Sequence, residues 1–166
     1  MCERYRPKVL LVEDNEGVAA VLTALLRGAG ECDVSWRQGV TDIDESSLTA
    51  MDVVVMDLQL ADSNVPNTIG LAQRWRAIVP VVIVSGYVDE LPLARSLGEQ
   101  RIPVIPKPPN PSTVLSVVLD AAAPRGTERL LRKAAEKLRK AIELHREAAT
   151  YVDRAVAGLG SEQEPR

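Results

Sequence analysis

Three short runs of consecutive apolar residues, without polar alternation, mark the first part of the chain. They fall within residues 8–12, 51–57 and 80–85. Runs of this kind are typical of strands that are buried on both faces of a parallel sheet. Residues 32–36 form a weaker strand signal. Residues 102–107 also look extended, and their two prolines favour an edge strand over a central one.

Segments with the period of an amphipathic helix separate these strands. The clearest follows Asn15, a good helix cap, and spans residues 18–27, with Val18, Val21, Leu22, Leu25 and Leu26 on one face. Four further helices are predicted at residues 40–48, 68–78, 89–97 and 112–123. Strands and helices therefore alternate five times, which predicts an α/β domain with a parallel sheet and right-handed crossovers.

The pattern changes after Pro124. We expect residues 1–123 to form the α/β domain, 124–126 a linker, 127–160 one long α-helix and 161–166 a disordered tail. Thr127 can cap the long helix.

The long helix carries an apolar stripe with a seven-residue repeat. Its large members, which we take as candidate interface residues, are Leu131, Leu138, Ile142, His145, Val152 and Val156, and alanines fill the positions between them. A small domain cannot bury so long a stripe alone. The stripe favours self-association, as a dimeric coiled coil or a four-helix bundle, over docking on a different protein.

Composition and charge support two differently built parts. The 166 residues are 46% hydrophobic and 26% charged, which is ordinary for a globular protein. The net charge of −3 argues against general nucleic-acid binding. Residues 1–124 carry −6 and residues 125–166 carry +3. The second part is too short for a DNA-binding output domain beside its helix.

Targeting signals and disulfides are not expected. Cys2 and Cys32 have no metal-ligand spacing, and reduced thiols are the simplest interpretation. The apolar run at residues 9–12 is too short for a signal sequence or a membrane span. We therefore expect a cytoplasmic protein that does not associate with membranes.

Polar residues follow the predicted strands at their carboxyl ends. Asp14, Asp57, Ser85 and Lys107 each come at or just after such an end. Because these ends share one edge of a parallel sheet, the side chains should converge where open α/β sheets bind ligands. Clustered carboxylates repel unless a cation lies among them, and oxygen ligands favour Mg²⁺. A lysine at the same place can balance a phosphoryl group.

These motifs give residues 8–123 a resemblance to the receiver domain of bacterial two-component response regulators. The matching pieces, in order, are Glu13-Asp14, Asp57-Leu-Gln-Leu, Ser85-Gly86 and Lys107-Pro108. Each is weak alone, but all four at these spacings are highly specific. The resemblance implies a flavodoxin-like, doubly wound five-stranded parallel sheet with strand order 2-1-3-4-5. It also implies a cis Lys107–Pro108 bond.

The resemblance further implies that Asp57 is a phosphoacceptor. Its donor would be the phosphohistidine of a sensor histidine kinase or of a histidine phosphotransfer protein. Mg²⁺ would be held by Asp14, Asp57 and the backbone carbonyl of Gln59, with Glu13 acting through water. The protein would then not be an enzyme beyond catalysing its own phosphorylation and dephosphorylation.

The remaining positions of the resemblance concern phosphate binding and its lifetime. Lys107 would pair with the phosphoryl oxygens, Ser85 would hydrogen-bond one of them, and Gly86 would leave room for access. Gln59 and Tyr87 occupy positions that tune how long the phosphate survives. Three family features differ here. Val104 stands where an aromatic switch residue is common, Ala61 where proline is common, and Val65 where glycine is usual.

Two other functions remain open. In the first, the protein is a phosphorylation-independent adaptor assembled through its helix. In the second, His145 acts as a further phosphoacceptor in a relay. The residues around His145 lack a phosphotransfer motif, and its place on the apolar stripe favours packing.

Overall fold

The computed structural model describes the backbone of residues 5–86, 97–99 and 101–160, and the side chains of these residues up to residue 150. Tyr87 and almost all of the helix expected at residues 89–97 lie outside this part, as does the tail expected at 161–166. The chain divides into two compact units, Met1–Gly126 and Thr127–Arg166.

The first unit is built on a five-stranded parallel sheet with the order β2-β1-β3-β4-β5. Its strands are β1 (Lys8–Val12), β2 (Asp33–Arg37), β3 (Val53–Met56), β4 (Val81–Ser85) and β5 (Val104–Pro106). This confirms the predicted sheet. The proline-containing strand β5 lies at an edge, where a missing N–H disturbs no second neighbour.

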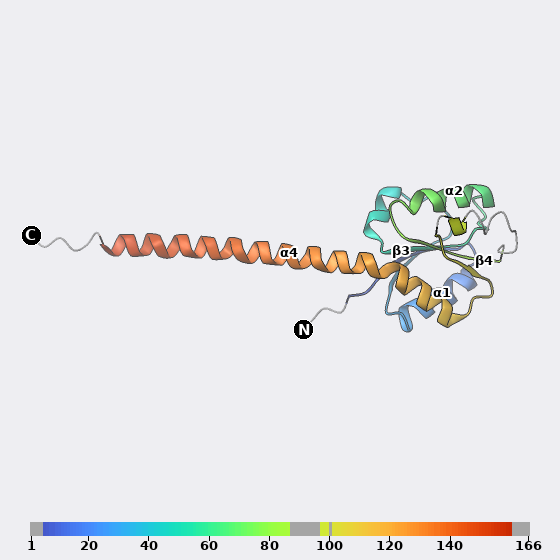
Figure 1. Ribbon diagram of the computed structural model, residues 1–166, viewed down its shortest axis with the longest axis horizontal. Helices are drawn as coiled ribbons and strands as arrows, with labels where there is room; N and C mark the ends of the chain where they lie inside the picture. Colours follow the sequence, from blue (N-terminus) through green and yellow to red (C-terminus); the bar gives the residue numbers. More distant parts are fainter. Residues whose placement is uncertain (1–4, 87–96, 100, 161–166) are drawn as a thin grey trace, which may run out of the picture. The chain divides into compact units, whose positions relative to one another are not determined.

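Helices cover both faces of this sheet (Figure 1). On one side lie α1 (Glu16–Gly28) and the first turns of α4 (Pro111–Gly160). On the other side lies α2 (Val65–Trp75), close to the short 3₁₀ helix η1 (Glu45–Ala50). Successive residues of a strand point to opposite faces of the sheet and so join the two hydrophobic cores in turn. Val9 and Leu11 pack with α1 and α4, whereas Leu10 and Val12 pack with α2.

Two local expectations in this unit were wrong. Val21 is 68% exposed, because α1 buries only a narrow stripe of Ala19, Leu22 and Leu26 against the sheet. The helix expected at residues 40–48 is replaced by η1, which begins later. Its cap, Asp44, accepts a hydrogen bond from the Ser46 N–H at 3.0 Å.

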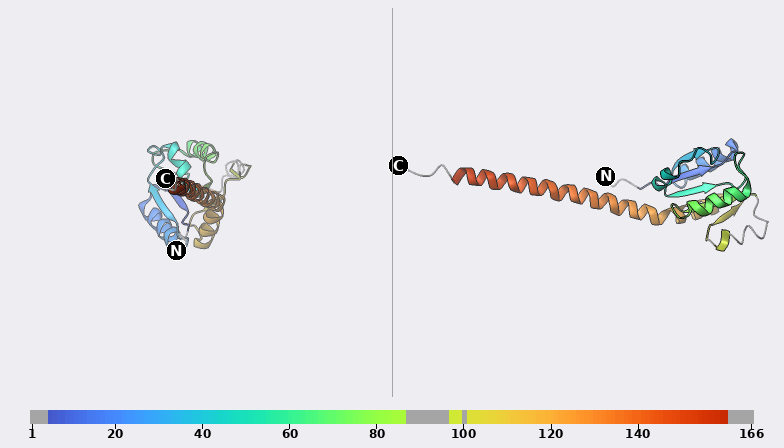
Figure 2. Two further views of the ribbon diagram at one scale, coloured as in Figure 1. Left: turned by 90° about the vertical axis from the view of Figure 1, so that its left-hand side faces the viewer. Right: turned by 90° about the horizontal axis from the view of Figure 1, so that it is seen from above.

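The expected linker at residues 124–126 is also wrong, because α4 runs through it without a break (Figure 2). Pro124 removes one intrahelical hydrogen bond, which normally disfavours a helix. The two following residues both lie against other parts of this unit. The Arg125 guanidinium donates to the Met51 carbonyl at 3.0 Å. Gly126 lies so close to the Tyr5 ring that a Cβ there would approach Tyr5 Cε1 to 2.4 Å.

The second unit consists of the continuation of α4 from Thr127, which the structure places inside the helix rather than at a cap. Leu131 and Leu138 are more than half exposed, Ile142 is 48% exposed, and His145 is exposed. The backbone at Val152 and Val156 is helical. Among the residues with described structure, none of the helices combines the length and apolarity that crossing a membrane requires.

Candidate phosphoryl-acceptor site

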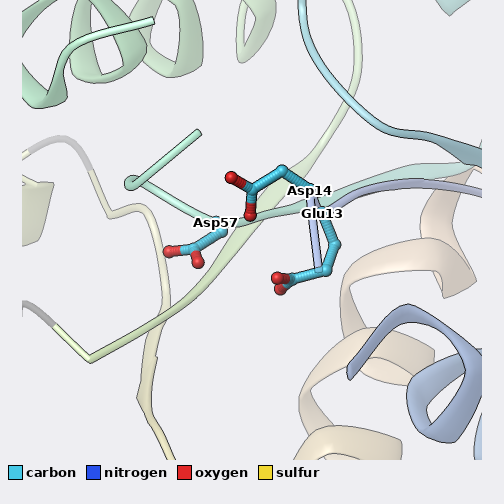
Figure 3. A group of neighbouring side chains, drawn as sticks. All are labelled: Glu13, Asp14 and Asp57. Atoms are coloured by element: carbon cyan, nitrogen blue, oxygen red, sulfur yellow. The ribbon is translucent and has the colours of Figure 1, made fainter. Parts of the chain in front are cut away.

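The carboxyl ends of β1 and β3 bring three carboxylates together, as Figure 3 shows. One carboxylate oxygen each from Glu13, Asp14 and Asp57 can be chosen so that all lie within 4.8 Å of one another. Glu13 and Asp57 are almost fully buried, at 1% and 6% exposure, while Asp14 is partly exposed. The strands place them there, since β1 and β3 are parallel neighbours and end at the same level.

Lys107, which follows β5, supplies the positive charge of the site. Its Nζ atom lies 2.6 Å from Glu13 Oε2 and 2.6 Å from Asp57 Oδ2. Partial burial lowers the pKa of Lys107, but the hydrogen bonds to Asp57 and Glu13 outweigh burial and hold that pKa above its ordinary value. The ammonium therefore stays charged and bridges two buried acids.

Backbone N–H groups orient the carboxylates. Asp57 Oδ1 accepts a hydrogen bond from the Gln59 N–H at 3.1 Å, and Asp14 Oδ2 accepts one from the Ala61 N–H at 3.0 Å. The loop after β3 thus contacts both acids. Gln59 is exposed, and its backbone is drawn toward Asp57 by this bond.

The remaining predicted site residues come from the ends of β4 and β5. Ser85 is fully buried, and its carbonyl accepts a hydrogen bond from the Lys107 N–H at 3.0 Å. Gly86 is exposed, and a Cβ placed on it would meet nothing within 4 Å, so the space beside it is open. The Lys107–Pro108 bond is cis, as the resemblance implied.

Sequence reasoning missed a clamp that holds the loop after β3. The Asp62 carboxylate accepts hydrogen bonds from the Val40 N–H at 2.7 Å, the Thr41 N–H at 2.9 Å and the Thr41 hydroxyl. Gly39 allows this approach, because a Cβ there would lie 2.2 Å from Asp62 Oδ2. The sequence carries no signal for this pairing, because its partners are more than twenty positions apart in two loops.

A second missed contact involves Trp36, the last residue of the weaker strand signal at residues 32–36. Its indole N–H donates to the Glu13 carbonyl at 2.8 Å. The Glu13 backbone N–H in turn donates to the Arg37 carbonyl at 3.1 Å. The end of β2 therefore fixes the backbone of Glu13, beside the acidic cluster.

The donor set fits a small divalent cation. Three carboxylates with oxygens that can approach one another within 4.8 Å are hard ligands, and Mg²⁺ uses one or two such groups while keeping several waters. Asp14 is the most exposed of the three. The arrangement can hold a cation next to a buried, lysine-paired carboxylate, which suits a phosphoryl group arriving from solvent.

Comparison with known proteins shows the fold. No family model matches the sequence, and no curated protein matches it. Among solved structures, a CheY-like response regulator receiver domain protein from Methanospirillum hungatei is 17% identical, with a TM-score of 0.60 over 74% of this chain and 98% of that one.

Two further structures extend this comparison. The HemR receiver domain from Leptospira biflexa is 24% identical, with a TM-score of 0.53 over 70% of this chain and 94% of that one. A receiver domain from Saccharomyces cerevisiae, solved with a histidine phosphotransfer signaling protein, is 15% identical. Its TM-score is 0.55 over 73% of this chain and 92% of that one. The chain therefore has the flavodoxin-like fold of response regulator receiver domains, followed by a long helix.

Proposed function

We propose that this protein is a response regulator that receives a phosphoryl group on Asp57 and signals through altered protein–protein contacts. One observation carries the proposal. A nearly buried Asp57 lies beside two further carboxylates and is paired with Lys107 at 2.6 Å, at the ligand-binding edge of a receiver fold. A structural ion pair needs one acid for one base, whereas here Lys107 contacts two acids and a third carboxylate lies beside them.

The chemical step follows from the position of Asp57. One carboxylate oxygen of Asp57 attacks the phosphorus of a phosphohistidine, so that a P–O bond forms as the P–N bond breaks. The electron pair of the broken bond returns to the imidazole nitrogen, and the product is an acyl phosphate. The Gln59 N–H holds Oδ1 at 3.1 Å, which fixes the orientation of the carboxylate for an in-line reaction.

Lys107 provides the clamp for the transferred group. In the described state its ammonium contacts Asp57 Oδ2 and Glu13 Oε2. Once Asp57 is phosphorylated, that contact passes to the phosphoryl oxygens, which carry more charge than the carboxylate did. Ser85 donates its hydroxyl to the same group, and Gly86 leaves the approach open.

Glu13, Asp14, Asp57 and the Gln59 carbonyl are the residues that hold Mg²⁺ in this proposal. When bound, Mg²⁺ supplies positive charge that stabilises the phosphoryl oxygens during transfer. Outside its own phosphorylation and dephosphorylation, the protein is proposed to catalyse no reaction. Gln59 and Tyr87 tune the lifetime of the phosphate.

The partner proposed for phosphorylation is a sensor histidine kinase or a histidine phosphotransfer protein in the cytoplasm. Support comes from the yeast receiver domain, which was solved with a histidine phosphotransfer protein. For the output, the exposed apolar positions Leu131, Leu138 and Ile142 favour self-association of the second unit over nucleic-acid or membrane binding. His145 is part of this face and takes no phosphate.

Phosphate incorporation tests the proposal. The full chain is incubated with Mg²⁺ and a small phosphodonor such as phosphoramidate, and its intact mass is measured. We expect a gain of one phosphoryl group that requires Mg²⁺ and disappears in Asp57→Asn. Asp44→Asn, which removes an exposed carboxylate in the same unit, is the matched control and should label normally.

Failure to label would favour the alternative, a phosphorylation-independent adaptor that uses the receiver fold as a scaffold. Label that survives in Asp57→Asn but is lost in His145→Ala would instead favour the relay. The output is tested separately by light scattering, with and without Mg²⁺ and beryllium fluoride as a phosphoryl mimic. A mass that rises with the mimic in the native chain but not in Asp57→Ala indicates gated assembly.

A further inference from the structure

The second unit presents an apolar face whose large and small members alternate regularly. Leu131, Leu138 and His145 recur every seven residues, and Ala134, Ala141 and Ala148 follow each of them by three. Leu131 and Leu138 are 67% and 62% exposed, so the face is open to a partner. These six residues correspond to the two core positions of a coiled coil.

The alternation fits one orientation of a second copy better than the other. In a parallel pair each residue meets its own copy, so layers of Leu against Leu alternate with layers of Ala against Ala. At the helix separation that the Leu layers set, the Ala layers are underfilled, which close packing disfavours. In an antiparallel pair centred on Glu143, Leu138 faces Ala148 of the second copy and Ala141 faces its His145. Every layer then holds one large and one small side chain.

Two exposed residues outside the six core positions support the same centre. Ile142 and Leu144 are 48% and 66% exposed and flank Glu143 on either side in sequence. In the antiparallel pair each of them lies at the two-fold axis, next to its own copy on one side of the seam. In a parallel pair, Ile142 and Leu144 would not lie next to their own copies. Each would instead face a different position beside the seam, and Leu144 would keep more of its exposed surface.

Charge is distributed unevenly along the helix in a way that also separates the two orientations. Residues 127–140 hold six Lys/Arg and two Asp/Glu, which gives a net charge of +4. Residues 141–160 hold two Lys/Arg and three Asp/Glu, which gives a net charge of −1. A parallel pair sets the two basic halves side by side. An antiparallel pair sets each basic half against a weakly acidic one, which lowers the repulsion between the copies.

We propose that the partner of this face is a second copy of the chain, paired antiparallel and in register about Glu143. The proposal rests on the self-association within the proposed function, and it adds the orientation and the register. It is independent of phosphate chemistry at Asp57.

Disulfide trapping in the full chain tests the orientation. Cys2→Ser and Cys32→Ala first remove the native thiols, and single cysteines are then introduced as Leu144→Cys, Ile142→Cys or Leu131→Cys. A disulfide needs Cα atoms about 4.4–6.8 Å apart. In the antiparallel pair, position 131 lies about 36 Å from its own copy, at about 1.5 Å per residue over the 24 residues between them. Glu143→Cys is the matched control, because it is at the same level but faces outward.

The expected result is a cross-linked dimer with Leu144→Cys or Ile142→Cys under mild oxidation, and none with Leu131→Cys or Glu143→Cys. Light scattering under reducing conditions verifies that each variant remains a dimer. Cross-linking at position 131 would mean parallel pairing and overturn the proposal. A dimer that links at none of these positions, or a tetramer, would overturn it too. A monomer would remove self-association altogether while leaving the phosphate-incorporation test unaffected.

Discussion

Replacing the lysine of the site should destabilise the first unit measurably. Lys107→Met keeps most of the side-chain volume but removes the ammonium that contacts Glu13 and Asp57 at 2.6 Å each. Two nearly buried carboxylates are then left facing each other without a cation. The consequence is electrostatic, so it can be estimated from the separation of the two acids.

Carboxylate oxygens of these acids lie within 4.8 Å of each other. At an effective dielectric constant of about 20, two unit charges at that distance repel by about 3.5 kcal/mol. Breaking a fully buried ion pair costs about 3–5 kcal/mol. Because the Lys107 side chain is 20% exposed, solvent screens part of this cost. We therefore expect Lys107→Met to lower the free energy of unfolding by about 2–4 kcal/mol without Mg²⁺.

The assay is urea unfolding followed by tryptophan fluorescence at neutral pH in the presence of a chelator. Both tryptophans, Trp36 and Trp75, lie in the first unit, so the signal excludes the long helix. Lys8→Met is the matched control, because Lys8 is exposed. Its expected effect is within about 0.5 kcal/mol.

Two additions to this experiment separate charge from packing. Adding Mg²⁺ should recover part of the stability lost in Lys107→Met, because a cation again lies among the acids. Adding Asp57→Asn to the same variant should also recover stability, because one of the repelling charges is gone. A loss in Lys107→Met no larger than in Lys8→Met, or a loss that neither addition reduces, would refute the electrostatic reasoning.

Three further predictions concern the loops and the buried thiol. Gly39→Ala should lower the free energy of unfolding in urea by about 1–3 kcal/mol, because its Cβ would lie 2.2 Å from Asp62 Oδ2. Gly28→Ala, which has open space around it, should not lower that free energy. Equal effects of the two substitutions would contradict the clamp. Burial raises the pKa of Asp62, but hydrogen bonds from Thr41 and Val40 outweigh it and hold the pKa below its ordinary value. The ionised carboxylate thus adds stability that is present above the unfolded pKa of about 3.9. This stability is lost as the pH falls through the folded pKa. Asp62→Asn should therefore be less stable than the native protein at pH 7, and the difference between them should shrink toward acid pH. Burial raises the pKa of the Cys32 thiol. In the Cys2→Ser variant, Cys32 should therefore react with a thiol reagent at about pH 8 much more slowly in the folded protein than in the urea-unfolded protein. Equal rates in the two states would refute this.

Sequence patterns predicted the sheet well because its strands are short apolar runs buried on both faces. Val53 to Met56 are all fully buried, and the polar residue that ends the run, Asp57, lies where a parallel strand delivers it. The same reasoning brought Lys107 to the site from the far edge of the sheet. In each case the strand direction and the pleat decide the position, and both can be read from the sequence.

Other features depend on contacts that no local pattern encodes. Pro124 indicated a break, but the helix is continuous there, and the next residue, Arg125, hydrogen-bonds the distant Met51 carbonyl. The carboxylate of Asp62 binds a loop more than twenty residues away, so neither its sequence neighbours nor its residue type announce the clamp. Long-range side-chain contacts of this kind override local propensity.

We propose that Asp57 itself carries the phosphoryl group. Borohydride reduces an acyl phosphate on aspartate to the alcohol, homoserine, so the modified residue is marked permanently. The phosphorylated chain is trapped in this way, digested and mapped by peptide mass spectrometry. We expect homoserine at position 57 alone, and only when Mg²⁺ and the phosphodonor are both present. Homoserine at Asp14 or at another carboxylate, with position 57 unchanged, would contradict it.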